Sequence, residues 1–359
     1  MFDFISWNKM QKLTLFLLTL LLLVTSIDLF SFSGGNGTVS NPYIIHKLAD
    51  LELLADSVRN GTNWSVNKYF KLTNDIANVT TPIGGISSTS YFSGFFDGNN
   101  HKITLAMFGS YNSYQYLGLF PMTRNAKITN LIVDGHISSS IQSFVGAIVG
   151  AAENTEIHNC INFADITADY VCIGGIVGHF GGRENRITGK ITNCMNYGNI
   201  KSIFEWQSGV YGKAVGGIVG HLADGKVEIL NCINMGIITG GGGGIIGLLG
   251  CGLPETDAVI HNCINIGSVR EGMVNGGIIG EIEKYEDDIV RAIITDCANA
   301  GHITAEIVRV NLGGGVTELA KVTGGIIGFS VFFANDIWIS DCVSTGEVDG
   351  YGGIIGFPK

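Results

Sequence analysis

Two short stretches decide the fold of this chain, Gly174-Gly175-Ile176-Val177-Gly178 and Ile191-Thr192-Asn193-Cys194-Met195-Asn196-Tyr197-Gly198, because both recur along it. The glycine half returns at 216–220, 243–247, 276–280, 324–328 and 352–356, with a weaker version at 145–150. Successive cysteines of the other half lie 34, 38, 31, 34 and 45 residues apart, from Cys160 to Cys342. Units of this length, with short β-branched segments and no helical periodicity, predict a solenoid of stacked β-strand rungs.

Stacked rungs place equivalent side chains above one another, about 4.8 Å apart. We therefore expect one asparagine per rung to hydrogen-bond with its neighbours above and below. This first row comprises Asn159, Asn193, Asn231 and Asn262, and Asp296 and Asp341 continue it. A second row comprises Asn162, Asn196, Asn234, Asn265 and Asn299. The glycine that follows each cysteine by four positions predicts a corner with positive φ.

One cysteine column accompanies these rows: Cys160, Cys194, Cys232, Cys263, Cys297 and Cys342. An even number of cysteines in an exported protein usually indicates disulfides. Parallel Cβ vectors on neighbouring rungs, however, do not favour the S–S torsion of about 90° that a disulfide prefers. We predict reduced cysteines that face the interior, with Cys172 and Cys251 outside the column.

Residues 1–33 have the pattern of an export signal. Lys9 and Lys12 precede an apolar run over 13–24, and Ser31-Phe32-Ser33 supplies small residues at a cleavage site, with cleavage after Ser26 as the alternative. The run is shorter than the roughly 20 residues that span a membrane. The prediction is a secreted or cell-surface protein, touching a membrane only if the signal stays uncleaved.

Residues 34–110 differ from the repeats and predict an N-terminal cap with the first coils. Strands are expected at 43–45, 69–72 and 92–100, and a helix at 48–58, where Leu51, Leu54, Ala55 and Val58 form one apolar face. Residues 111–359 carry the repeats, the last of them incomplete. Four Asn-x-Ser/Thr sequences in the cap are possible glycosylation sites in a eukaryotic host: Asn36, Asn60, Asn63 and Asn78.

The predicted fold is all-β: a right-handed parallel β-helix with an N-terminal cap that contains one short α-helix. Gly-Gly-Ile-Val-Gly, a loop, and Ile-x-Asn-Cys with glycine four residues later resemble the GLUG repeat of secreted and surface proteins. The stretches at 35–38, 41–45, 69–76 and 92–98 are similar to the usual lead-in of that family, whereas Pro121 stands where the first unit would carry glycine. The resemblance implies a β-helix in adhesin-like extracellular settings, and it transfers no catalytic residues.

Several apparent chemical motifs are better explained by the repeats. The 220–226 stretch has phosphate-loop spacing but continues with Val227, and the glycines at 242, 244 and 247 lack a βαβ unit. His179 and His221 follow equivalent glycine blocks and form a weak metal-site candidate, completed by Glu184 or Asp224. An acidic loop with Glu281, Glu283, Glu286, Asp287 and Asp288 could hold calcium, although a solvated loop explains it better. No cofactor and no catalytic residue is predicted.

The net charge of −10 and the scattered basic residues exclude a nucleic-acid partner. The leading hypothesis is a non-enzymatic surface protein that binds an extracellular carbohydrate or protein in adhesion. Its variable loops at 201–214, 281–290 and 306–322 would carry that binding. One alternative is a polysaccharide-active lyase-like or hydrolase-like β-helix, which would need paired carboxylates or bound calcium. Another is a structural protein that associates edge to edge with copies of itself.

Overall fold

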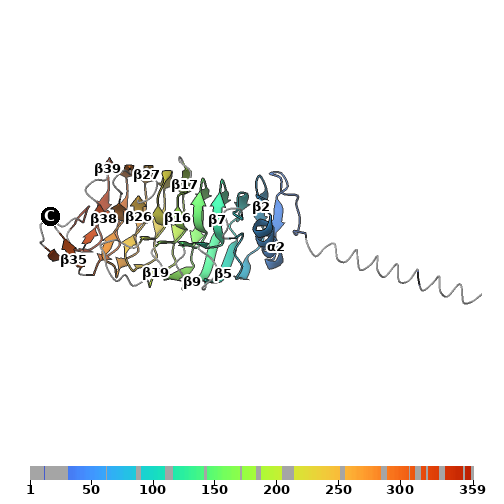
Figure 1. Ribbon diagram of the computed structural model, residues 1–359, viewed down its shortest axis with the longest axis horizontal. Helices are drawn as coiled ribbons and strands as arrows, with labels where there is room; N and C mark the ends of the chain where they lie inside the picture. The colour runs from blue at the N-terminus through green and yellow to red at the C-terminus, as the bar shows by residue number, and fades with distance from the viewer. Residues whose placement is uncertain are drawn as a thin grey trace, which may run out of the picture.

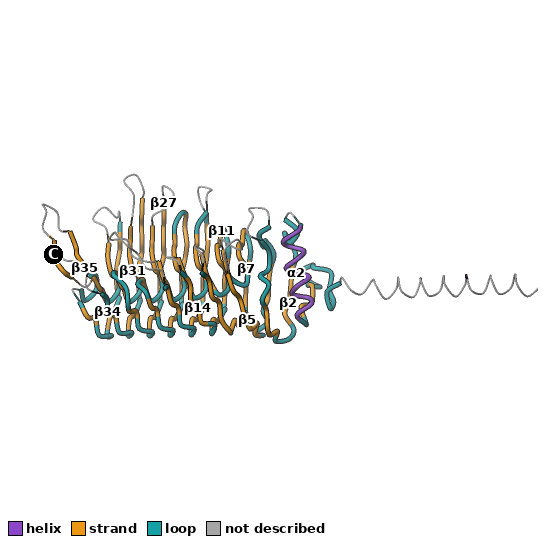
Figure 2. Tube along the Cα trace, turned by 60° about the horizontal axis from the view of Figure 1, so that its bottom comes forward, coloured by secondary structure: helices purple, strands orange, loops and turns teal. Residues whose placement is uncertain are grey.

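The computed structural model describes residue 12 and residues 31–356, apart from 62, 86–89, 110–115, 141–143, 170–171, 183–186, 204–213, 251–254, 284–288, 307, 312–316, 321, 331–335 and 351. In this part the chain forms the predicted parallel β-helix (Figure 1). Figure 2 shows the strands stacked as successive rungs, with the helix at one end of the stack. Each rung pairs with the rungs before and after it, so one repeat adds one strand to each of three sheets and two strands to the fifteen-stranded sheet.

The rungs build long parallel sheets. The ten-stranded sheet contains, in order, β1 (Tyr43–Ile45), β2 (Tyr69–Leu72), β4 (Phe95–Asp97), β8 (Lys127–Thr129), β12 (Glu156–His158), β17 (Thr188–Thr192), β22 (Gly225–Leu230), β27 (Glu255–His261), β32 (Ile289–Thr295) and β39 (Ile337–Ser340). One seven-stranded sheet contains β6 (Tyr116–Leu117), β10 (Phe144–Gly146), β15 (Cys172–Gly174), β20 (Ala214–Gly216), β25 (Gly242–Gly243), β30 (Val274–Gly276) and β37 (Val322–Gly324). The other contains β7 (Phe120–Arg124), β11 (Val149–Glu153), β16 (Val177–Phe180), β21 (Val219–Leu222), β26 (Ile246–Gly250), β31 (Ile279–Glu283) and β38 (Ile327–Ser330).

The fifteen-stranded sheet divides into two rows after its first strands. It begins with β3 (Ile76–Val79), β5 (Lys102–Gly109) and β9 (Ile132–Ser139). One row then contains β13 (Ile161–Asn162), β18 (Met195–Asn196), β23 (Ile233–Asn234), β28 (Ile264–Asn265), β33 (Ala298–Asn299) and β40 (Val343–Ser344). The other contains β14 (Asp165–Ala168), β19 (Ile200–Ser202), β24 (Ile238–Thr239), β29 (Val269–Arg270), β34 (Ile303–Thr304) and β41 (Val348–Asp349). An antiparallel hairpin of β35 (Val308–Asn311) and β36 (Thr317–Ala320) lies within one long insertion.

The interior is a stack of apolar columns. In the ten-stranded sheet the inward column begins with Phe70 and Phe96, each 1% exposed, and continues through isoleucines in register. These are Ile128, Ile157, Ile191, Ile229, Ile260 and Ile294. Because each rung covers the apolar side chains of the previous one, burial is shared along the whole array.

The second asparagine row is a buried ladder, which explains why the two motif halves recur together. Each of the side chains from Asn162 to Asn299 is fully buried. The Nδ2 of Asn196 donates to Oδ1 of Asn234 at 2.8 Å, and the Nδ2 of Asn234 donates to Asn265 at 2.8 Å. A Cβ on Gly217 would lie 2.4 Å from Cγ of Asn234. The second glycine is required to make room for the amide of the same rung in four blocks, at Gly175, Gly217, Gly244 and Gly277.

The first asparagine row also forms the expected ladder, but on the surface. The Nδ2 of Asn193 donates to Asn159 at 3.2 Å, and the Nδ2 of Asn231 donates to Asn193 at 3.0 Å. Asn159, Asn193, Asn231 and Asn262 have φ between 52° and 56°, a left-handed conformation that asparagine tolerates. These residues, and not the glycines after the cysteines, turn the corner.

The prediction of positive φ for the glycine four positions after each cysteine is wrong. Positive φ values occur at other glycines, and Gly236 is not among them. A Cβ on Gly236 would lie 1.9 Å from the carbonyl oxygen of Gly198 on the preceding rung. Glycine is needed there because the two backbones approach each other closely.

The cysteine column lies inside the helix. Cys160, Cys194, Cys232, Cys263 and Cys297 are fully buried with free thiols, and Cys342 is partly buried. Each thiol contacts a backbone carbonyl, as in Cys194, whose Sγ lies 3.4 Å from the oxygen of Thr192. Burial raises the pKa of the Cys160 and Cys232 thiols. Cys172 is also buried, which raises its pKa to about 12, and Cys251 lies outside the described residues.

The cap has the predicted helix, α2 (Leu48–Asn60), which buries Leu51, Leu54, Ala55 and Val58. Its first turn is held by Asp50, a carboxylate that is 1% exposed. Asp50 accepts hydrogen bonds from the backbone N–H groups of His46 and Lys47 at 2.9 and 3.1 Å. It also accepts from the N–H and hydroxyl of Ser33, at 3.0 and 2.7 Å.

The start of the described chain is part of this cap. The Phe32 ring lies 4.6 Å from Tyr43, between ring centroids, and contacts Trp64 and Phe70. Removal of residues 1–33 would strip these contacts and two hydrogen bonds from buried Asp50, whereas cleavage after Ser26 would keep them. The remainder of the predicted signal falls outside the described residues, except residue 12.

Within the described residues, no helix has the length and apolar character needed to span a membrane.

Candidate functional site

The outward face of the ten-stranded sheet carries three grooves. One residue from each strand except β1 projects from the middle of this face, and these residues are paired in register from strand to strand. This central column contains Tyr69, Phe95, Lys127, Glu156, Lys190, Glu228, Val259, Ile293 and Trp338. It is aromatic at the cap end, charged in the middle and apolar at the other end.

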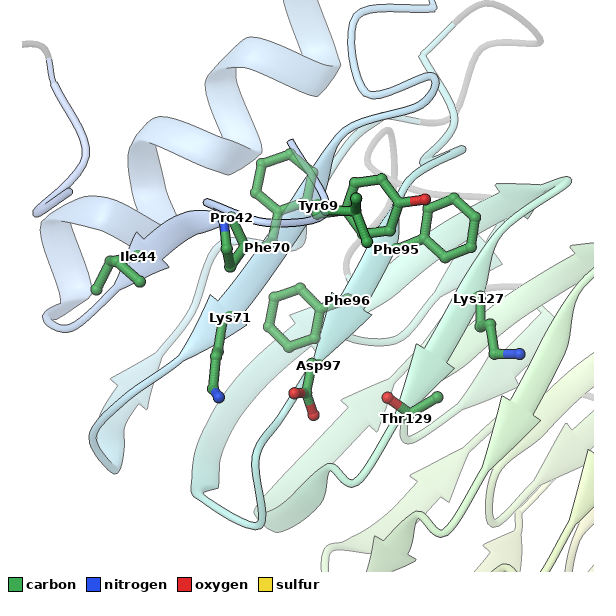
Figure 3. Close-up of a pocket in the computed structure, with 11 residues that line it drawn as sticks. Pro42, Ile44, Tyr69, Phe70, Lys71, Phe95, Phe96, Asp97, Lys127 and Thr129 are labelled. Atoms are coloured by element: carbon green, nitrogen blue, oxygen red, sulfur yellow. The ribbon is translucent and has the colours of Figure 1, made fainter. Parts of the chain in front are cut away.

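The cap end of the column forms an aromatic groove of about 500 Å³. The rings of Tyr69 and Phe95 are stacked, with centroids 4.4 Å apart and planes 5° from parallel. Figure 3 shows these two rings side by side, with Lys71, Asp97 and Thr129 along the next column. The groove thus combines an apolar aromatic stack with charged and hydroxyl groups in one lining.

The middle of the column is an alternation of charges. Lys127 Nζ lies 2.8 Å from a carboxylate oxygen of Glu156, and Lys190 Nζ lies 2.9 Å from Glu228. The four side chains are 35–55% exposed, so these ion pairs contribute little to stability. A second groove of about 570 Å³ continues the first, lined by Phe95, Asn125, Ala126, Lys127, Asn154, Glu156 and Thr188.

The far end of the column forms a third groove of about 570 Å³ around Val259, Ile293 and Trp338. The Trp338 side chain is 66% exposed. Beside it, Nε of Arg291 lies 2.5 Å from one oxygen of Asp257, and an Nη lies 3.1 Å from the other. Lys226 and Asp336 complete the charged wall of the groove.

Burial dominates the electrostatics of Asp257 in this groove. It raises the pKa of the Asp257 carboxyl, and the Lys226 ammonium offsets only part of that rise. The two-point contact with the Arg291 guanidinium fixes the orientation of the carboxyl group. A ligand at this end meets a carboxylate and a guanidinium fixed against each other, next to an exposed indole.

The candidate metal residues His179 and His221 are neighbours in register, with ring centroids 5.0 Å apart. The His221 Nε2–H donates to the carbonyl oxygen of Gly250 at 2.7 Å, while Nδ1 of His179 has no partner among the described residues. Burial, and secondarily His221, lowers the pKa of His179 to about 3. The described residues contain no group of three or more possible metal ligands, and Glu184 lies outside them.

The remaining predicted positions lie elsewhere. The four sequon asparagines, Asn36, Asn60, Asn63 and Asn78, are exposed in the cap. Glu281 is 3% exposed, so it belongs to the wall of the helix and not to a solvated acidic loop, and 286–288 lie outside the described residues. Most of 201–214, the 284–288 part of 281–290 and parts of 306–322 also lie outside them.

Sequence reasoning missed the central column, although a signal was present. The column occupies the position four residues before each cysteine, where the repeats show Glu156, Lys190, Glu228, Val259, Ile293 and Trp338. The inward position directly after it keeps an apolar side chain, such as Ile157, Ile191 and Ile229. A variable position inside a constrained motif marks a surface that the fold leaves free.

Comparisons with known proteins agree with the fold. The chain matches no protein-family model. It matches none of the curated proteins. Among solved structures it is similar to a Bacteroides ovatus protein named "putative immunoglobulin A1 protease", with a TM-score of 0.54 and 20% identity over 84% of this chain and 87% of that one. The fold and the face together define a parallel β-helix with a grooved ten-stranded sheet; at this identity the likeness extends to the fold alone.

Proposed function

We propose that this chain is a secreted or cell-surface protein that binds an extended carbohydrate along the outward face of the ten-stranded sheet, without catalysing a reaction on it. The observation that carries the proposal is the presence of three grooves on one face, with the partly exposed Tyr69 and Phe95 rings at one end and the exposed Trp338 indole at the other. The predicted export signal and the GLUG resemblance support the extracellular setting, and both stay predictions.

Carbohydrate fits the chemistry of the face. The C–H side of a sugar ring packs against an aromatic ring, and its hydroxyls bond to charged and hydroxyl side chains. The stacked Tyr69 and Phe95 rings offer an aromatic contact of this kind, and the Trp338 indole offers another. Both stand on strands of a rigid array, so binding orders few side chains and loses little conformational entropy.

The carboxylates of the face suit binding more than hydrolysis. Glu156, Glu228 and Asp257 are each held by a cation, at 2.8, 2.9 and 2.5 Å. A general acid and base for glycoside cleavage need carboxyl groups placed on either side of a bond, with their pKa values set apart. If incubation with polysaccharides produced new reducing or unsaturated chain ends, the protein would be an enzyme, and the proposal of binding without catalysis would be wrong.

The proposal is tested on a panel of immobilised polysaccharides with matched aromatic variants. Tyr69→Ala with Phe95→Ala should weaken binding roughly tenfold, because both stacking contacts are lost. The control is Phe163→Ala with Tyr197→Ala, a stacked and exposed pair 4.8 Å apart on the fifteen-stranded sheet. Loss of binding in the control but not in the first variant, or no binding to any polysaccharide, would overturn the proposal.

A further inference from the structure

The charged middle of the central column specifies a class of carbohydrate. Lys127, Glu156, Lys190 and Glu228 stand on four successive strands, β8, β12, β17 and β22, as paired in register. Like charges therefore recur at every second strand, a separation of about 9.6 Å when neighbouring strands lie about 4.8 Å apart. Opposite charges are offset by one strand.

Resting on the proposed function, we infer that the ligand is a linear polysaccharide whose sugars carry ammonium and carboxylate groups alternately. An extended chain of equatorially linked pyranoses advances by close to one strand spacing per ring. Each ligand carboxylate would then lie over a lysine and each ligand ammonium over a glutamate. An extended peptide fits poorly, because its same-face side chains recur at roughly 6.8 Å.

The ion pairs within the column do not prevent its lysines and glutamates from pairing with a charged ligand instead. Lys127–Glu156 and Lys190–Glu228 are exposed pairs, which contribute little net free energy and open readily. The outward residues beside this stretch are Thr129, His158, Thr192 and Leu230 on one side and Asn154, Thr188 and Lys226 on the other. Lys226 adds a cation next to Glu228 at the β22 end of the stretch. A polymer of one charge sign would meet two repulsive groups for every two attractive ones, which disfavours purely anionic and purely cationic chains.

The test compares four hexasaccharides by calorimetry at low salt. They are fully de-N-acetylated hyaluronan, which alternates ammonium and carboxylate; hyaluronan, which is anionic; chitosan hexamer, which is cationic; and cellohexaose, which is neutral. The alternating probe should bind at least tenfold more tightly than each of the others, and 0.5 M salt should reduce this preference.

Two variants test whether the preference for the alternating hexasaccharide comes from the four charged side chains. Lys127→Gln, Glu156→Gln, Lys190→Gln and Glu228→Gln together should remove the tenfold preference. The reversed set, Lys127→Glu, Glu156→Lys, Lys190→Glu and Glu228→Lys, should keep it within about threefold, because a shift by one ring restores every pairing. All four side chains are exposed, so circular dichroism should show unchanged folding for both variants.

The outcomes separate this inference from the proposed function. Equal binding of cellohexaose and the alternating probe, still dependent on Tyr69 and Phe95, would overturn the inference and leave carbohydrate binding intact. A preference that survives the four glutamines would also overturn it. If no hexasaccharide and no polysaccharide of the panel binds, the proposed function itself fails.

Discussion

Replacement of one buried ladder asparagine tests the account of the fold most directly. Asn234 accepts a hydrogen bond from Asn196 at 2.8 Å and donates to Asn265 at 2.8 Å and to the Gly236 carbonyl at 3.0 Å. Asn234→Ala leaves a buried N–H of Asn196 and the buried Oδ1 of Asn265 without these partners. Each such group costs about 1–3 kcal/mol, so with the small cavity we expect a loss of about 3–5 kcal/mol in the free energy of unfolding.

The matched control lies three residues away in the same rung. Asn231 makes equivalent ladder bonds, at 3.0 Å to Asn193 and 2.9 Å from Asn262, but it is exposed. Asn231→Gly keeps the left-handed backbone, and water replaces the lost amide, so the loss should stay below about 1 kcal/mol.

Urea unfolding, followed by circular dichroism and tryptophan fluorescence, measures both variants. The two signals must give the same transition before a free energy is extracted, because repeat arrays can unfold in parts. If Asn234→Ala gives no folded protein, Asn299→Ala replaces it, since its ladder bond ends on Ser344 at 3.2 Å. The reasoning is refuted if the loss in the free energy of unfolding for Asn234→Ala lies within about 1 kcal/mol of the loss for Asn231→Gly.

Three further predictions concern protonation, thiols and the cap. Because burial lowers the pKa of His179 in the folded state, the contribution of neutral His179 to the free energy of unfolding is complete above about pH 6.5 and is lost as pH falls toward 3. In urea titrations at pH 5, His179→Phe should therefore recover about 1–2 kcal/mol of the stability that the protein loses in acid. An unchanged dependence of stability on pH would contradict this. The six buried thiols of Cys160, Cys172, Cys194, Cys232, Cys263 and Cys297 should react with a thiol reagent only after unfolding, and fewer than four free thiols in urea would indicate disulfides. A chain that starts at Gly34 should melt several degrees below one that starts at Ile27, because Asp50 loses two hydrogen bonds; equal melting temperatures would mean that Phe32 and Ser33 are dispensable.

Much of the fold could be predicted because stacking constrains sequence locally. The repeat of Gly-Gly blocks and of Asn-Cys pairs indicated rungs, and the spacing of Leu51, Leu54 and Val58 indicated the cap helix. The sequence did not show which asparagine row is buried and which is exposed, since both rows recur with the same period. The surface row and the buried row differ only in which way the backbone turns at Asn231 and at Asn234.

The candidate site was harder to predict because it depends on register. Lys127 and Glu156 are 29 residues apart, and nothing local brings them together until β8 and β12 are paired. Sequence patterns therefore directed attention to the long loops, whereas the structure places the aligned grooves on the strands themselves. The one positional clue was variability at a fixed offset from each cysteine.

The register of the central column fixes distances along the outward face of the ten-stranded sheet. The distance between the Tyr69–Phe95 platform and the Trp338 platform is fixed by how many rungs separate β4 from β39, and loop lengths between rungs do not enter it. Duplication or loss of one repeat would change that distance by one strand spacing and invert the phase of the charges beyond it. Insertion or loss of a repeat of 31–45 residues would thus change the length of this face in steps of one rung, and with it the length of the ligand in the proposed function, while every rung keeps the same internal packing.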